Sequence, residues 1–235
     1  MPSSHSPLPP GQIERSSFDR FGLGLFAKRF PTQPDVIRID IGGDIATPVV
    51  IQEQLADLPR VEQVSDFHCV TTWSVTALKW GGYRFADFYE RLVVPLAAPD
   101  PRAQFVVLKG QDGFRVSMQL EDLLQSDVLL ADTLNGQPLG VAHGAPLRLV
   151  APAHYGYKNM KHVCAVEFWK DGRHYSFPLP YPDLMDHQRG RVALEERTRL
   201  IPGPLIRYFY RALAPLARHK SRKALEKYLR EHGKD

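Results

Sequence analysis

Short apolar runs, many of them bounded by glycine or proline, recur between residues 36 and 177 of the chain. Residues 36–41 alternate apolar and polar positions and end at a pair of glycines, which is typical of a strand. Residues 104–109 form a denser apolar run that predicts a buried strand, and residues 147–150 predict a shorter one. The pattern therefore predicts a domain built largely from strands.

Asp-Gly and Asn-Gly pairs predict three hairpins, because these pairs favour the tight turns between antiparallel strands. The turns are predicted at Asp112-Gly113, Asn135-Gly136 and Asp171-Gly172. The first joins the buried strand to residues 114–120, the second lies within 128–139, and the third folds residues 162–177 back on themselves. A further strand over residues 60–67 is predicted to pair with the first strand of the chain.

Helical spacing in this part of the chain is confined to short segments. Residues 51–58 and 120–124 each predict a brief helix, and apolar positions three and four residues apart predict an amphipathic helix over 85–93. Because strands and short helices are intermixed, the predicted fold class is α+β, with mainly antiparallel or mixed sheets.

The two ends of the chain differ from its middle, which gives three predicted segments. Residues 1–34 are rich in proline and serine around aromatic rings, and they predict an irregular arm held to the core by those rings. Residues 35–180 form the main domain. Residues 181–235 predict a linker and a basic amphipathic helical tail, which Pro215 is expected to kink or split. The tail has large apolar residues on one face, at Leu205, Phe209, Leu213 and Leu216.

The positive charge of the chain is concentrated in this tail. Residues 189–235 contain 13 lysines and arginines against 5 acidic residues, whereas residues 1–188 contain 17 against 21. The body has no basic stripe with interleaved aromatic rings, which disfavours nucleic acid as a partner. Two interpretations of residues 205–232 stay open. The helix lies on an anionic membrane surface, or its apolar stripe packs on the core or on a protein partner.

Composition and the N-terminal segment indicate a soluble protein of a reducing compartment. The chain has 235 residues, of which 43% are hydrophobic and 24% charged, and no apolar run reaches the length of a membrane-spanning helix. The N-terminal residues MPSSHSPLPPGQIERSSF contain neither a signal-peptide core nor a paired-arginine signal. We therefore expect a cytoplasmic protein, which the basic tail could hold at the surface of a membrane.

Cys69 is the first candidate for chemistry, because it follows the predicted strand 60–67 within the segment HCVTTWS. A lone cysteine in such a place is more often a small buried apolar residue than a ligand or nucleophile. His68 would point to the opposite face of the strand, which disfavours a Cys/His dyad. No second cysteine or histidine has the spacing of a structural zinc site, and Cys164 is interpreted as a core residue.

A second group of candidates lies in the segments NGQPL, HGAPLRLVAP and YGYKNMK, between residues 135 and 161. They combine His143, Arg148 and two lysines with glycines and prolines. Arginine and lysine side chains suit a phosphate, and glycines let backbone N–H groups approach an anion. The alternative is a solvated basic face on a hairpin. Arg148 fits that alternative less well, because it lies within an apolar strand.

The order and separation of these segments resemble the molybdopterin-binding oxidoreductase domain of sulfite oxidases and of bacterial methionine-sulfoxide reductase catalytic subunits. The resemblance covers residues 36–168 and implies a sulfite-oxidase-like fold that binds a molybdenum–molybdopterin cofactor. It implies that Cys69 is the catalytic thiolate ligand of the metal. The residues that it places against the pterin and its phosphate are Gly110, His143, Arg148, Asn159, Met160 and Lys161. The aromatic arm near Arg20 and Phe21 would cover the cofactor.

The resemblance also implies an enzyme that transfers an oxygen atom to or from a small sulfite-like or sulfoxide-like substrate, with a separate electron carrier. Val70, Thr71 and Thr72 follow the cysteine, where sulfite oxidases have arginines, and this departure disfavours sulfite itself. Two alternatives remain at this point. One is a non-catalytic binding or scaffold module of the same fold that docks to a partner or membrane through its tail, and the other is a cysteine-dependent hydrolase.

Overall fold

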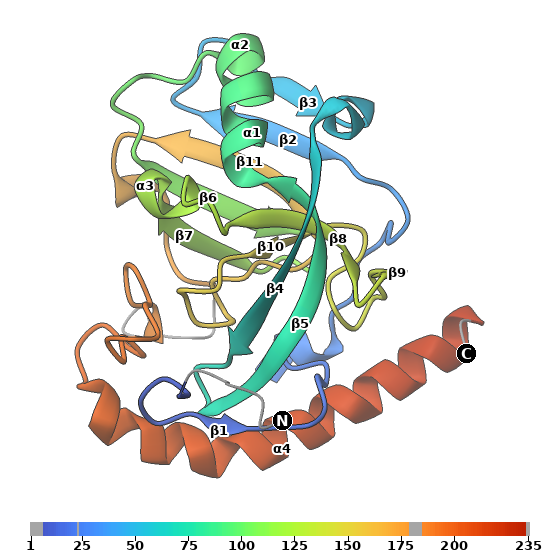
Figure 1. Cartoon of the computed structure of the whole chain (residues 1–235), viewed down its shortest axis with the longest axis vertical. Coiled ribbons are helices and arrows are strands. Elements are labelled where there is room, and N and C mark those ends of the chain that lie inside the picture. Colours follow the sequence, from blue (N-terminus) through green and yellow to red (C-terminus); the bar gives the residue numbers. More distant parts are fainter. Residues whose placement is uncertain (1–6, 23, 179–184, 234–235) are drawn as a thin grey trace, which may run out of the picture.

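Two β-sheets form the body of the molecule, and one long helix, α4 (Gly203–His232), lies along its lower side (Figure 1). The computed structural model describes residues 7–22, 24–178 and 185–233. Residues 1–6 of the predicted arm and 181–184 of the predicted linker lie outside the described residues.

The larger sheet has six strands in the described part of the chain. They are β1 (Ile13–Glu14), β4 (Arg60–His68), β5 (Trp73–Arg84), β8 (Leu129–Leu134), β9 (Gln137–Pro138) and β10 (Arg148–Val150). β4 and β8 run antiparallel to β5, and β10 pairs with β8. The loop after β4 and the strand that carries Arg148 therefore belong to one rigid sheet.

The sequence does not predict β5, because Gly81-Gly82 has the composition of a strand end. In the structure both glycines lie inside the strand, where β8 pairs with it. A Cβ atom on Gly82 would collide with the carbonyl of Leu130, and one on Gly81 with the hydroxyl of Thr133. The two glycines therefore permit close pairing of the strands and do not end β5.

The smaller sheet has five strands in the described residues, and it mixes parallel and antiparallel pairs. Their order is β3 (Val49–Ile51), β2 (Ile39–Gly43), β11 (Val163–Trp169), β6 (Phe105–Gly110) and β7 (Arg115–Gln119). β2 and β11 are parallel, and the other pairs are antiparallel. The predicted α+β class with mixed sheets is confirmed, and so are the hairpins at Asp112-Gly113 and Asn135-Gly136.

Two predicted strand pairings are wrong. Residues 60–67 do form a strand, but β4 pairs with β5 in the other sheet, and β3 takes the place beside β2. After β11 the chain enters a 3-10 helix, η4 (Gly172–His174), and no returning strand follows within the described residues. Both edges of β11 already pair, with β2 and with β6, so that no edge is left for a hairpin partner.

The helical segments before α4 are short. Besides η4, the described residues contain η1 (Gly24–Lys28), η2 (Glu53–Asp57), α1 (Phe85–Phe88), η3 (Tyr89–Val93), α2 (Val94–Ala97) and α3 (Leu120–Leu123). α1, η3 and α2 follow one another without a break, so the helix predicted over 85–93 is present and extends to Ala97. Phe85 and Phe88 on this helix are fully buried in the main core, together with residues of the smaller sheet such as Leu108.

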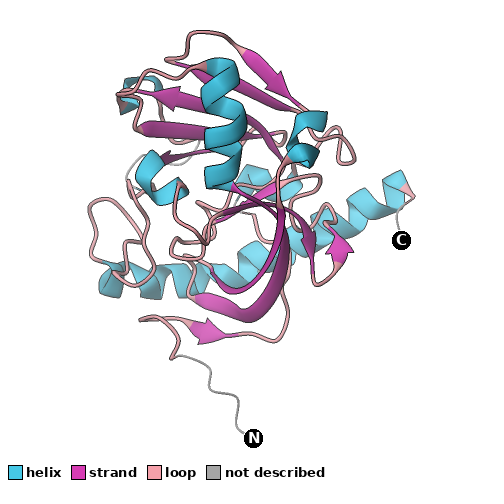
Figure 2. Ribbon diagram, turned by 45° about the horizontal axis from the view of Figure 1, so that its top comes forward, coloured by secondary structure: helices cyan, strands magenta, loops and turns pink. Residues whose placement is uncertain are grey.

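Helix α4 continues past the body of the molecule at its C-terminal end (Figure 2). Pro215 is exposed and lies within this single helix, so the helix is not split there as the sequence suggested. Leu205, Phe209 and Leu216, predicted to share a face, are on the exposed side of the helix. No helix among the described residues combines the length and apolar character that crossing a bilayer requires.

Candidate functional site

A cavity of about 130 Å³ lies where the loop after β4, strand β10, the loop before β11 and the N-terminal arm meet. Six of the seven residues that the motifs single out line it, namely Cys69, His143, Arg148, Asn159, Met160 and Lys161. Aromatic rings from the arm and from the larger sheet, such as Phe21 and Trp73, complete the wall. The structure thus brings together side chains that lie about 90 residues apart in sequence.

Cys69 occupies a tight turn between β4 and β5. Its backbone N–H donates to the carbonyl of Trp73 at 2.8 Å, and its own carbonyl accepts from the N–H of Thr72 at 3.1 Å. Thr72 has a left-handed backbone conformation, with φ of 75°. The Cys69 Sγ atom lies 3.1 Å from the Thr71 hydroxyl. This turn fixes the sulfur at the end of a rigid sheet, facing the cavity.

The electrostatic environment of Cys69 has opposing components. Burial raises the pKa of its thiol, while the hydrogen bond with Thr71 and the positive charges of Arg197 and Lys161 act in the opposite direction. His68 does not contact the sulfur, because its Nδ1 atom lies 2.7 Å from the Ser74 hydroxyl. The thiol therefore has cations nearby, and its neighbouring histidine is engaged elsewhere.

Arg148 is almost fully buried on β10, with 2% of its surface exposed. Its guanidinium donates to the carbonyl of His143 at 2.8 Å and lies over the ring of Trp80, 4.9 Å from the centroid. No carboxylate among the described residues forms an ion pair with it. Burial lowers the pKa of Arg148 to about 9, because the charged guanidinium is removed from water.

Lys161 is a second cation in the same wall. Its Nζ atom donates to the carbonyl of Phe21 in the arm at 3.1 Å. Burial, together with the positive charges of Arg20 and Arg148, lowers the pKa of Lys161 to about 7. Asp112 acts in the opposite direction, but burial raises the pKa of that carboxyl.

Arg20 adds a third cation, brought by the arm. It is buried, and its guanidinium donates to the carbonyls of Ala27 and Arg29 at 2.6 and 2.8 Å. Burial lowers the pKa of Arg20 to about 10. Three basic side chains and one carboxyl, that of Asp112, thus line the cavity. Such an excess of buried positive charge favours an anionic ligand, which would form charge-assisted hydrogen bonds away from bulk water.

His143 is the neutral member of the wall. Its ring stacks on that of Phe18, with centroids 4.7 Å apart and planes 18° from parallel. Burial, followed by the charges of Arg148 and Lys161, lowers the pKa of His143 to about 4. The imidazole is therefore uncharged at neutral pH and can donate one hydrogen bond without adding to the positive charge.

Asn159 and Met160 contribute differently from what their place in the motif suggests. The Asn159 side chain is used by the protein, since its Oδ1 atom accepts from the N–H of Ala151 at 2.8 Å and its amide donates to three carbonyls. The Met160 carbonyl accepts from the N–H of Leu149 at 2.8 Å. These bonds tie the loop before β11 to strand β10 and so hold Lys161 beside Arg148.

Gly110 is the one predicted residue that does not line the cavity. It ends β6 directly behind the loop of Lys161, where a Cβ atom would lie 2.5 Å from the Lys161 carbonyl and 2.8 Å from Asp112 Oδ1. The glycine is therefore needed for the close approach of β6 to this loop. Gly110 therefore supports the loop of Lys161 and does not itself face the cavity.

Arg197 and Tyr210 reach the site from the C-terminal segment, and no motif in the sequence indicates either residue. Arg197 is fully buried, and its guanidinium donates to the carbonyl of Val70 at 2.7 Å and to that of Pro10 at 3.1 Å. Tyr210, on the inward face of α4, lines the cavity. Only the folded chain brings these residues beside the cysteine turn, because they lie about 130 residues away in sequence.

Comparison with known proteins gives matches over most of the body. The family model described as the oxidoreductase molybdopterin binding domain matches residues 27–176. The uncharacterized oxidoreductase YuiH of Bacillus subtilis is 32% identical over 167 residues, which cover 70% of this chain and 80% of that protein. The protein-methionine-sulfoxide reductase catalytic subunit MsrP of Campylobacter jejuni is 29% identical over 173 residues. That match covers 66% of this chain and 56% of the relative.

Two further matches are shorter. The putative protein-methionine-sulfoxide reductase subunit YedZ1 of Azospira oryzae is 32% identical over 114 residues, or 48% of this chain and 41% of that protein. Among solved structures, the sulfane dehydrogenase SoxCD of Paracoccus pantotrophus matches with a TM-score of 0.50 and 22% identity. It covers 57% of this chain and 38% of the other, and this likeness supports the expected fold. The chain spans about half the length of these relatives or less, apart from the Bacillus protein.

Proposed function

The chain belongs to the oxidoreductase molybdopterin-binding domain family, as its motifs predicted, and from this premise we propose that the cavity holds a molybdenum–molybdopterin cofactor. In this proposal the Cys69 thiolate is the protein ligand of the metal. The observation that carries it is that one inward-facing sulfur shares a cavity with buried basic side chains that form no ion pair within the described residues. A soft thiolate suits a metal already bound by sulfur, and the cations suit an anionic organic group.

Different residues of the cavity wall would contact different parts of the cofactor. Arg148 and Lys161 would neutralise the phosphate of the cofactor, and His143 would offer a neutral hydrogen bond to the pterin. Arg20 and Phe21, carried by the arm, would cover the cofactor and exclude water. The Thr71 hydroxyl and the charges of Arg197 and Lys161 would favour the thiolate form of Cys69.

The bound group would supply two-electron oxygen-atom transfer, while the protein sets its orientation, its charge environment and the access of substrate. The substrate in this proposal is a small sulfoxide-like or sulfite-like compound, and electrons pass to or from a separate carrier. The sulfoxide-like class is favoured by the names of two relatives, which are methionine-sulfoxide reductase subunits. The uncharged side chains of Val70, Thr71 and Thr72 after the cysteine agree with a substrate that carries no net charge.

Substitution of the cysteine tests the proposal. Protein made with ample molybdate is expected to contain about one molybdenum atom per chain and to reduce a sulfoxide with an artificial electron donor. Cys69→Ser should lose at least about a thousandfold in turnover, because a hydroxyl would replace the soft thiolate that the proposal assigns to the metal. Its unfolding midpoint should stay close to that of the wild type, since the change removes no packed volume of note.

Cys164→Ser is the matched control, because Cys164 lies on β11 and does not line the cavity. It should keep wild-type turnover and molybdenum content. Normal turnover of Cys69→Ser would contradict the proposed ligand. A wild-type chain that binds no molybdenum and no pterin would favour the scaffold alternative.

A further inference from the structure

Helix α4 packs on the body through one aromatic ring and four small residues. Its buried positions are Gly203, Tyr210, Ala214, Ala217 and Ser221, spaced by seven, four, three and four residues along one stripe. The Ser221 hydroxyl donates to the carbonyl of Gly22 at 3.0 Å and accepts from its N–H at 3.1 Å. These contacts define the inward face of α4. Leu205, Phe209 and Leu216 are not part of it.

Those large residues are on the outward face. Leu205, Phe209 and Leu216 are 67%, 55% and 54% exposed, and Tyr208 beside them is 61% exposed. Leu200 and Ile201, just before the helix, are exposed as well. Single exposed apolar residues are common on protein surfaces, but a row of them along one helix face is typical of a binding surface.

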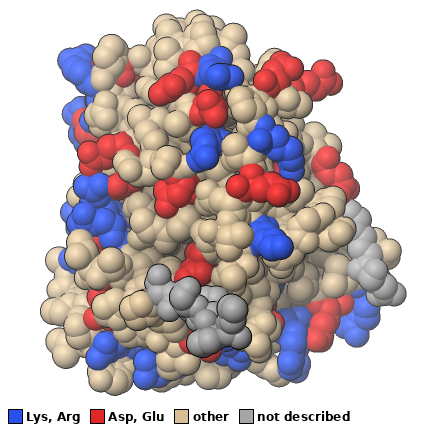
Figure 3. Space-filling model, in the orientation of Figure 1, with Lys and Arg blue, Asp and Glu red and all other residues tan. Residues whose placement is uncertain are grey.

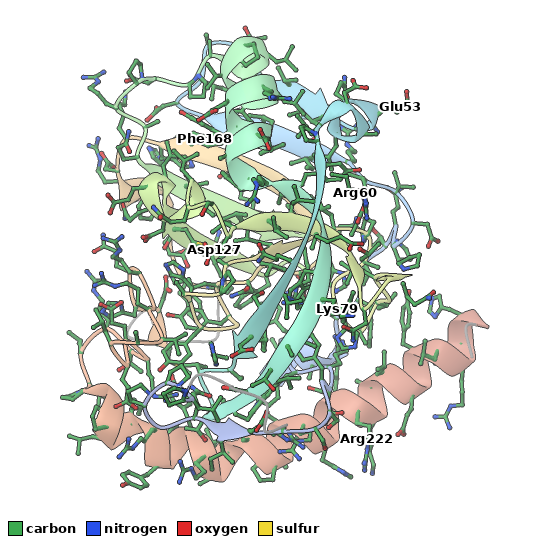
Figure 4. The ribbon with its side chains drawn as sticks, in the orientation of Figure 1. Glu53, Arg60, Lys79, Asp127, Phe168 and Arg222 are labelled. Atoms are coloured by element: carbon green, nitrogen blue, oxygen red, sulfur yellow. The ribbon has the colours of Figure 1, made fainter. Side chains whose placement is uncertain are left out.

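The same outward stripe becomes cationic in the second half of the helix. With 3.6 residues per turn, positions 205, 209 and 216 are followed on that stripe by Lys220, Lys223 and Lys227, all exposed. The helix contains eight lysines and arginines against two glutamates. In Figure 3, blue side chains follow the lower edge of the molecule, where Figure 1 places α4. Arg222 points away from the two sheets (Figure 4).

We propose that the outward face of α4 docks on an anionic lipid surface. The apolar half would insert Leu205, Phe209 and Leu216 among the lipid chains, and the lysines of the other half would pair with headgroups. A second copy of the chain fits this face less well, because the excess of positive charge on one helix would meet the same excess on the other. The helix is about 45 Å long, which allows many headgroup contacts at once.

Docking would also orient the cavity. Tyr210, on the inward face of the same helix, lines the cavity, so only one helix, about 10 Å thick, would separate the cavity from the lipid headgroups. The proposal itself does not require a bound cofactor, because every residue that it uses is on the outward face. Vesicle binding can therefore be measured whether or not the chain is loaded, and its result is independent of the proposed redox function.

Flotation with vesicles tests this surface. The full chain is expected to float with vesicles of three parts phosphatidylcholine and one part phosphatidylglycerol. It should bind pure phosphatidylcholine much less, and added salt should weaken the binding. Phe209→Ser with Leu216→Ser should weaken binding at least about tenfold, because two apolar side chains no longer leave water. The matched control, Val50→Ser with Val64→Ser, removes two exposed apolar side chains from strands and should bind like the wild type.

A charge reversal separates the lipid from other occupants. Lys223→Glu should weaken binding to the anionic vesicles, whereas Lys79→Glu, which changes an exposed lysine of β5, should not (Figure 4). Equal flotation of the wild type and the double serine variant would overturn the proposal. So would failure of the wild type to float, or a concentration-dependent dimer in sedimentation that the double serine variant abolishes, since that result would assign the face to a second copy.

Discussion

Buried basic side chains that form no ion pair in the described part of the chain are the defining residues of the candidate site. Arg148 and Lys161 hold backbone carbonyls, and those bonds offset only part of the cost of removing a charge from water. Three such residues at one cavity would be an unusual choice for stability alone. They are consistent with a site whose buried positive charge is neutralised when an anion binds.

Lys161 should make the stability of the cofactor-free chain depend on pH. Its pKa is lowered in the folded state to about 7, so between about pH 7 and 10.5 the unfolded chain binds more protons at this site. The destabilisation is complete below about pH 7 and is relieved as the pH rises. Lys161→Met should therefore raise the unfolding midpoint in denaturant more at pH 6 than at pH 9. Lys79→Met is the exposed control, and an equal gain for Lys161→Met at both pH values would contradict the lowered pKa.

Strand β5 follows the cysteine turn and fixes its position in the larger sheet. Replacement of a glycine of β5 by any residue with a side chain is expected to destabilise the protein. Gly82→Ala would drive a Cβ atom into the backbone of β8, and we expect a loss of about 1–3 kcal/mol in the free energy of unfolding. Gly140→Ala is the control, because a Cβ atom there would meet nothing within 4 Å. Chemical denaturation of both variants measures the effect. Equal stability of the two would mean that β5 and β8 can separate without loss.

Much at the scale of elements could be predicted from local patterns, and what failed depended on distant contacts. Turns at Asp112-Gly113 and Asn135-Gly136 have local causes, so their hairpins were predictable. The turn at Asp171-Gly172 has the same composition, yet β11 has no free edge, and only the complete sheet reveals this. The motifs indicated Cys69, Arg148 and Lys161. Arg197 carries no local signal, because it reaches the site through the fold of the C-terminal segment.

Loading of the cavity should stabilise the whole molecule. A group that binds only the folded chain raises its free energy of unfolding by RT ln(1 + [L]/Kd), where [L] is the free ligand concentration. Protein from molybdate-starved cells should therefore unfold at a lower temperature than loaded protein, measured by calorimetry. Arg148→Met should reduce that difference, because the neutral side chain leaves less positive charge for the ligand to neutralise. An unfolding temperature that is the same with and without the cofactor would indicate that the cavity is not its site.

Residues from the N-terminal arm, the main domain and helix α4 line the cavity. Arg20 and Phe21 come from the arm, and Tyr210 comes from the last helix. The hydrogen bonds between Ser221 and Gly22 fasten the arm to that helix. During synthesis on the ribosome, both sheets emerge before residue 221 does. The arm and helix α4 can therefore be joined only after the rest of the cavity wall has been synthesised.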